Sequence, residues 1–217
     1  MSFPTRVKPR YTGTDVQSAE RTAARRIGRT AAWAAALLIT LYAGEGLAGI
    51  KPPEEHLDRD TGATITVVAE PLTFAAARPD LAANARDYVT LAAAAVDLNR
   101  KVRYLLIAYF WSTVDPRLRP GMPHAPESLV LQADDRRIQL ALRDMRESGI
   151  ATPVHPPAAA DATPYAYATD LATLRFIAEA RRLTIPSDSE DAPFGYELWE
   201  DQRPALRAFV RHLNGED

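Results

Sequence analysis

Hydrophobic positions first gather in residues 30–50, where charged side chains are almost absent. The stretch from Thr30 to Gly44 carries no charge, and Glu45 is the one acidic residue before Ile50. A helix of this length rises about 30 Å, which matches the hydrocarbon thickness of a bilayer. An uncharged run of four turns leaves no polar face, so it does not fit a soluble amphipathic helix. The pattern predicts one transmembrane helix over 30–50.

The flanks of this segment indicate its orientation. Three arginines precede it and two aromatic residues lie near its ends, namely Arg25, Arg26, Arg29, Trp33 and Tyr42. Cytoplasmic flanks of membrane spans are enriched in Lys and Arg, and Trp and Tyr favour the interface. We therefore expect residues 1–29 to be a basic cytoplasmic tail in a bacterium. The span would cross the inner membrane once and place the rest of the chain in the periplasm.

A cleaved secretory signal is the main alternative. Gly46, Leu47 and Ala48 supply small residues around a cleavage point. However, the basic region before the apolar run would be unusually long for a secretory leader, and Arg25–Arg26 matches a twin-arginine signal poorly. The basic tail could also be a disordered soluble terminus. Both the anchor and the signal place residues 51–217 outside the cytoplasm.

Beyond the apolar segment, residues 51–62 are polar and proline-led, which is typical of a linker. Residues 63–217 change to a period of two, which predicts a β-rich domain. Two apolar runs flank the polar turn at Asn99–Lys101, and a second alternating pair flanks Asp134–Arg137, so both regions read as hairpins. Further short strands are expected at 65–68, 165–167, 183–185 and 194–199.

Helical periodicity appears only in the last third of the chain. Thr169 is expected to cap a helix over 170–181, and Asp201 to cap a final helix that carries Leu206, Phe209 and Val210. Short strands in hairpins with two late helices predict a mainly β domain. The expected architecture is an antiparallel β-sandwich, or a curled antiparallel sheet, with two short helices.

Charge and composition exclude several classes of function. Residues 1–30 carry seven basic and two acidic residues, so residues 31–217 have a net charge of −7. A folded part without basic excess does not suit nucleic acid. The chain has no cysteine, which excludes disulfides, thiolate metal sites and cysteine nucleophiles.

No motif specifies catalysis, a cofactor or a metal. The four histidines are His56, His124, His155 and His212, and none has a metal-ligand spacing. The acidic run 187–191 lacks the calcium-loop spacing, and no glycine-rich nucleotide motif occurs. Ser112, Asp115 and His124 could be drawn as a triad, but Ser112 lacks a nucleophile-elbow sequence and is expected to bond the local backbone.

The aromatic residues of the predicted strands are the remaining candidates. Tyr109, Trp111 and Trp199 are predicted as contacts to a partner, although filling the core is the simpler role for any one of them. We expect an anchored, non-enzymatic scaffold or binding protein, an accessory or assembly subunit of an integral membrane protein complex. The alternative is a periplasmic ligand-binding module or hydrolase with a cleft near Trp111 and His124.

Overall fold

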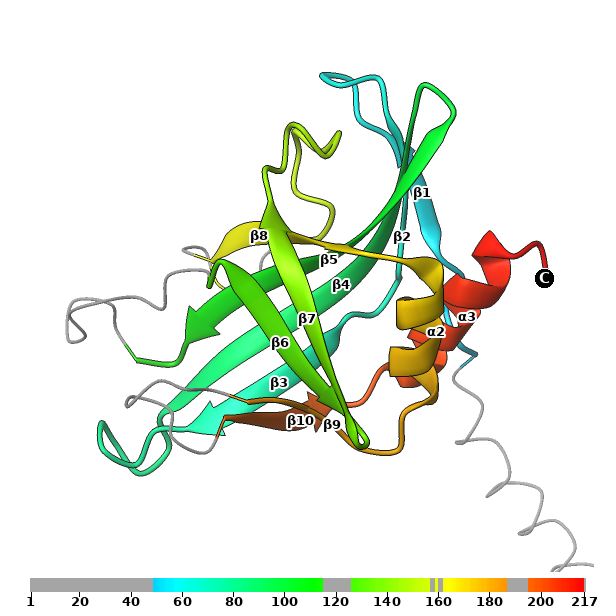
Figure 1. The fold of residues 1–217 in the computed structure, drawn as a ribbon. Helices are drawn as coiled ribbons and strands as arrows, with labels where there is room; N and C mark the ends of the chain where they lie inside the picture. Colours follow the sequence, from blue (N-terminus) through cyan, green and yellow to red (C-terminus); the bar gives the residue numbers. More distant parts are fainter. Residues whose placement is uncertain (1–48, 115–125, 157–158, 160–161, 187–194, 217) are drawn as a thin grey trace, which may run out of the picture. The chain divides into compact units, whose positions relative to one another are not determined.

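The structure is a computed structural model that describes residues 49–114, 126–156, 159, 162–186 and 195–216 (Figure 1). The chain divides into two compact units, Met1–Gly49 and Ile50–Asp217, and all described elements belong to the second. The predicted span over 30–50 lies outside the described residues except for its last two, which are exposed. Within the described ranges, no helix has the length and apolar character needed to cross a membrane.

The described residues of the second unit form strands and two helices in the following order: β1 (Glu54–Leu57), β2 (Thr64–Val67), β3 (Leu72–Ala77), β4 (Arg86–Leu98), β5 (Lys101–Ser112), β6 (Ser128–Ala133), β7 (Arg136–Arg143), β8 (Thr163–Thr169), α2 (Leu171–Glu179), β9 (Leu183–Ile185), β10 (Tyr196–Glu200) and α3 (Arg203–Leu213). The mainly β class with two helices is therefore confirmed.

Eight of these strands close into a barrel, which is where the structure departs from the expected sandwich (Figure 1). The hydrogen-bonded order is β4-β3-β10-β9-β6-β7-β8-β5, and β5 pairs again with β4. Each neighbouring pair is antiparallel. Closure occurs because the short β9 connects β10 to β6, so that one sheet curls onto itself and two separate layers do not form.

The long β4–β5 hairpin organises the barrel and confirms the turn expected at Asn99. Every residue from Asp87 to Leu98 pairs with β5. Asn99 and Arg100 form the connection with φ values of 56° and 63°, the left-handed conformation that a two-residue hairpin turn of this kind requires. The other edge of β4 is shared, because its first half pairs with β3 and its second half with β2.

Large apolar side chains fill the barrel. The strand register places them on one face of the sheet, and each is less than 2% exposed: Phe74, Leu91, Leu106, Leu129, Leu131 and Tyr167. The opposite face of β4 and β5 is also buried in part, under the segment that carries Ile150 and Val154. This double cover explains why β5 is apolar on both faces, as expected for a central strand.

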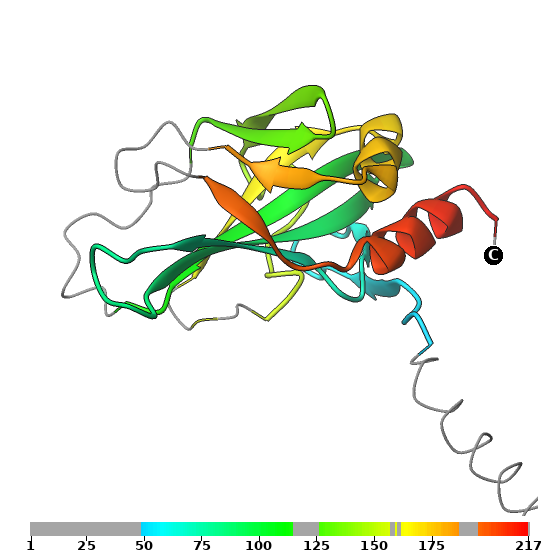
Figure 2. The same ribbon diagram turned by 90° about the horizontal axis from the view of Figure 1, so that it is seen from below.

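The two helices pack side by side against one end of the barrel (Figures 1 and 2). Their buried residues are Leu174, Ile177 and Ala178 of α2, and Ala205, Leu206, Phe209 and Val210 of α3. The predicted caps are not those observed. Thr169 ends β8, where it pairs with Tyr104, and Asp170 caps α2 instead. Asp201 lies one residue before the N-cap Gln202 and pairs with Arg203.

Part of the region expected to be a linker is folded. Glu54–Leu57 form β1, which pairs with β2 over its whole length. Asp58 then closes the turn that follows, and its carboxylate also binds the backbone of Ala151 and Thr152. The sequence pattern gave no strand signal here because β1 is an edge strand whose side chains are largely exposed, so backbone pairing alone holds it.

Candidate functional site

The three aromatic residues predicted as contacts lie around one cleft. The cleft has a volume of about 360 Å³ and opens on the outer face of β3, β4, β5 and β10, next to His155 and Pro156. Tyr109, Trp111 and Trp199 all line it. The structure therefore brings these residues together, while their role as contacts stays a prediction.

Strand register explains how distant segments reach this cleft. Tyr88 of β4 lies opposite Trp111 of β5, and Thr90 lies opposite Tyr109. Thr73 of β3 is next across the sheet from Thr90. On β10 the register shifts between Leu198 and Glu200, which adds Trp199 as an extra residue and lets it join the outer face.

The aromatic rings of the cleft are already in contact with one another. Tyr88 stacks on Trp111 with 4.0 Å between ring centroids and 8° between planes. Trp199 meets Tyr88 edge-on at 6.4 Å, and the Arg86 guanidinium lies 4.6 Å from the Trp199 ring centroid. Trp199 is nevertheless 53% exposed, a large aromatic surface left to solvent. Such an arrangement presents rigid aromatic area at little entropic cost.

Tyr109 forms the buried wall of the cleft and not its accessible surface. It is 2% exposed, and burial raises the pKa of its phenol. The Tyr109 hydroxyl donates to the carbonyl of His155 and accepts from its backbone N–H, both at 3.3 Å. The His155 ring Nε2 lies 2.6 Å from the Val68 carbonyl, which assigns the proton to this nitrogen. These bonds hold the 155–156 segment against the sheet.

The remaining polar groups are few and mostly engaged. Thr73 donates from its hydroxyl to the Glu200 carboxylate at 3.2 Å. The indole N–H of Trp111 donates to the Thr90 hydroxyl, also at 3.2 Å. Glu200 is exposed and lines the cleft, and Arg86 contacts the Trp199 ring without lining the cleft itself. The cleft therefore offers aromatic faces bordered by one acidic and one basic group.

Tyr88 is the functional candidate that the sequence analysis missed. The sequence did contain the information needed to identify Tyr88. If residues are paired outward from the two-residue turn at Asn99 and Arg100, Tyr88 lies opposite Trp111. The cross-strand neighbour of a candidate aromatic residue in an antiparallel pair lies on the same face.

Of the candidate catalytic residues, only Ser112 lies in the part of the chain that the structure describes. The Ser112 hydroxyl donates to the Arg86 carbonyl at 3.3 Å and accepts from the Val114 N–H at 3.1 Å, the local backbone bonding expected of a strand end. Asp115, His124 and the acidic run 187–191 lie outside the described residues. Within the described ranges, no three His, Cys, Asp or Glu side chains come close enough to hold a metal ion.

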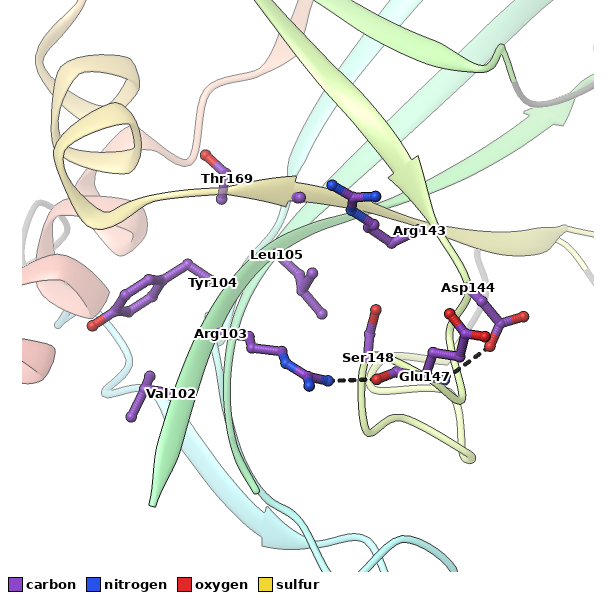
Figure 3. A pocket seen from close by; sticks show the side chains of 10 residues that line it. Val102, Arg103, Tyr104, Leu105, Arg143, Asp144, Glu147, Ser148 and Thr169 are labelled. Carbon is purple, nitrogen blue, oxygen red and sulfur yellow. Dashed lines mark hydrogen bonds between the residues drawn. The ribbon is translucent and has the colours of Figure 1, made fainter. Parts of the chain in front are cut away.

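A second cavity, of about 400 Å³, lies beside β5 and the turn at 144–148 (Figure 3). Two arginines and two acidic residues line it, so its charges balance: Arg103, Arg143, Asp144 and Glu147. Arg103 donates to the Glu147 carbonyl, and the Asp144 carboxylate accepts from the Glu147 N–H at 2.9 Å. These contacts use the polar groups of the cavity to hold the turn. The aromatic cleft is therefore the stronger candidate site.

No protein-family model matches this chain, and neither a curated protein nor a solved structure does.

Proposed function

We propose that this chain is a single-span membrane protein whose periplasmic barrel binds a segment of an integral membrane protein complex. It would serve that complex as an accessory or assembly subunit. The observation that carries the proposal is the exposed aromatic cleft formed by Tyr88, Trp111 and Trp199 beside Arg86.

The composition of the cleft supports a protein partner. Trp, Tyr and Arg are enriched among the residues that dominate binding energy at protein interfaces. Here all three types are held in mutual contact before any partner arrives. A preformed aromatic surface avoids part of the ordering cost of association.

The distance from the predicted span supports a partner in the same membrane. Only three residues separate the end of that span at Ile50 from β1 at Glu54. Three extended residues reach about 10 Å. A domain held this close meets membrane neighbours at a high effective concentration, which favours weak contacts.

The test uses the full-length chain, extracted from its native membranes in mild detergent and measured by native mass spectrometry. We expect the full-length mass within a defined larger assembly, and loss of the partner with Trp199→Ala. Val102→Ala is the matched control, because Val102 is 49% exposed on β5 but lies outside the cleft. A wild-type chain that always runs alone, or a Trp199→Ala chain that retains its partner, would contradict the proposal.

A small-ligand module is the second candidate, because the cleft volume falls in the range of about 300–1,000 Å³ typical of ligand pockets. Thr73, Thr90 and Glu200 would then orient the ligand. In this case the chain purifies free of protein partners, and a soaked ligand shifts Trp fluorescence in the wild type but not in Trp111→Ala. A hydrolase would additionally lose activity with Ser112→Ala or His124→Ala while keeping its fold.

A further inference from the structure

The two helices concentrate positive charge on an acidic domain. Residues 50–217 contain 19 Lys and Arg against 25 Asp and Glu, a net charge of −6. The segments 170–182 and 201–216, which include α2, α3 and the acidic residues at their starts, hold two aspartates and two glutamates against six arginines, of which Arg203 is paired with Asp201: Arg175, Arg181, Arg182, Arg203, Arg207 and Arg211. Such a local excess of positive charge in an acidic domain favours an acidic partner.

A groove of about 360 Å³ runs between the helices, and three of these arginines line it. Arg207 and Arg211 are one turn apart on α3, and Arg175 faces them from α2. All three are exposed. Arg207 donates to the Ala178 carbonyl at 2.9 Å, whereas Arg175 and Arg211 have no ion pair or side-chain hydrogen bond with any residue that the structure describes.

The chain enters the domain at this groove. Ile50, which is 50% exposed, lines it together with residues of α2 and α3. Figure 2 shows the first described residues and β1 beside α3. Ile50 is also the last residue of the predicted span, so the residue at which the chain would leave the bilayer is itself part of the α2–α3 groove.

We propose that the α2–α3 face docks on the anionic phosphate headgroups of the membrane in which the chain is anchored. The inference rests on the anchor in the proposed function. Arginine forks match phosphate geometry, and anionic lipid surfaces attract basic residues within a Debye length of about 8 Å at physiological salt. Glu179 and Glu216 also border the groove, but the arginines of the face outnumber them.

The absence of cysteine allows a direct measurement of this contact. A fluorophore on Ala172→Cys reports on the exposed side of α2, and one on Ala77→Cys reports on the last residue of β3, the strand end that Figure 1 shows away from α2 and α3. The full-length chain is placed in nanodiscs of phosphatidylcholine alone, or of equal parts phosphatidylcholine and phosphatidylglycerol. We expect the Ala172 label to lose access to aqueous acrylamide only in the anionic discs, and the Ala77 label to stay accessible in both.

Charge variants identify the residues responsible. Each arginine near an anionic surface contributes about fivefold to binding, so Arg175→Gln with Arg211→Gln should lower the ratio of docked to undocked domain about 30-fold. This pair leaves the Arg207 bond to Ala178 intact. Arg143→Gln with Arg146→Gln is the control, because both are exposed arginines outside the groove. Equal melting temperatures establish that all variants fold.

The possible results distinguish a failure of headgroup docking from a failure of the membrane anchor. If the chain withstands alkaline washing of the discs while the Ala172 label stays equally accessible in both lipids, headgroup docking is overturned and the anchor stands. If the glutamine pair docks as well as the arginine control, the assignment to Arg175 and Arg211 is overturned. A chain that alkali releases from the discs overturns the anchor and the docking with it.

Discussion

At the scale of single residues, Asp58 is a buried carboxylate held by backbone donors. It is 3% exposed and accepts hydrogen bonds from the N–H groups of Asp60, Thr61, Ala151 and Thr152, at 2.8 to 3.1 Å. Burial raises the pKa of Asp58, but the four backbone hydrogen bonds together outweigh it and lower the pKa to about 2. The ionised form therefore connects the β1–β2 turn to the segment at 151–152.

This difference in pKa predicts how stability depends on pH. The folded-state pKa lies below the unfolded value of 3.8, so the stabilisation is complete above about pH 4 to 5 and is lost as pH falls toward 2. It amounts to about 2 kcal/mol at neutral pH. Asp58→Asn should remove it and flatten the pH dependence of the free energy of unfolding, measured by urea titration. Asp60→Asn, an exposed neighbour, should keep the wild-type profile; an unchanged slope in Asp58→Asn contradicts this account.

Arg100 offers a second prediction at the same scale. Its φ of 63° is unfavourable for a residue with a side chain, while glycine adopts it freely. Arg100→Gly should raise the free energy of unfolding by about 0.5–1 kcal/mol and increase the melting temperature measured by circular dichroism. The control is Lys101→Gly in the first position of β5, which should be destabilising. A lower melting temperature for Arg100→Gly would show that the turn is not strained.

At the scale of elements, the start of α2 depends on Asp170 and not on Thr169. The Asp170 carboxylate accepts from the Thr173 N–H at 2.7 Å, whereas the buried Thr169 hydroxyl has no partner among the described residues. Asp170→Ala should lower the free energy of unfolding by about 1 kcal/mol. Thr169→Val keeps the side-chain shape and removes an unsatisfied hydroxyl, so it should be neutral or stabilising. Thermal unfolding of the two variants compares them, and the reverse order would restore Thr169 as the cap.

At the scale of the whole molecule, three seams of the barrel are narrow, because β6–β9, β9–β10 and β7–β8 are each joined by two residue pairs. β9 has three residues and pairs with β6 only through Thr184 and Leu183, whereas β4 and β5 pair along nearly their full lengths. Local unfolding occurs most readily in regions with few backbone hydrogen bonds and few packing contacts. Native-state hydrogen exchange should therefore show faster exchange for the β6–β9 amides than for the β4–β5 amides. Uniform protection around the ring would show that the β6–β9 seam is not a weak point.

Local signals were enough for the hairpins and for the helical regions. Asn99 and Arg100 mark a turn between two apolar runs, and Asp134 opens the next hairpin with a φ of 51°. The register of the first hairpin then follows by counting, which is why Trp111 could be placed on a face and Tyr88 could have been found opposite it. Apolar periodicity likewise located the buried face of α3, because it depends only on residues three or four apart.

Closure of the barrel and assembly of the cleft depended on the tertiary structure. Alternation reveals which face of a strand is apolar, but not which strand it will meet. The pairings of β10 with β3 and of β8 with β5 join segments far apart in the sequence through backbone hydrogen bonds, which any side chain except proline permits. The pairing of β10 with β3, and of β3 with β4, brings Trp199 to Tyr88 and Thr73 to Glu200. The sequence thus determined which aromatic residues were available, and long-range backbone pairing decided that they share one site.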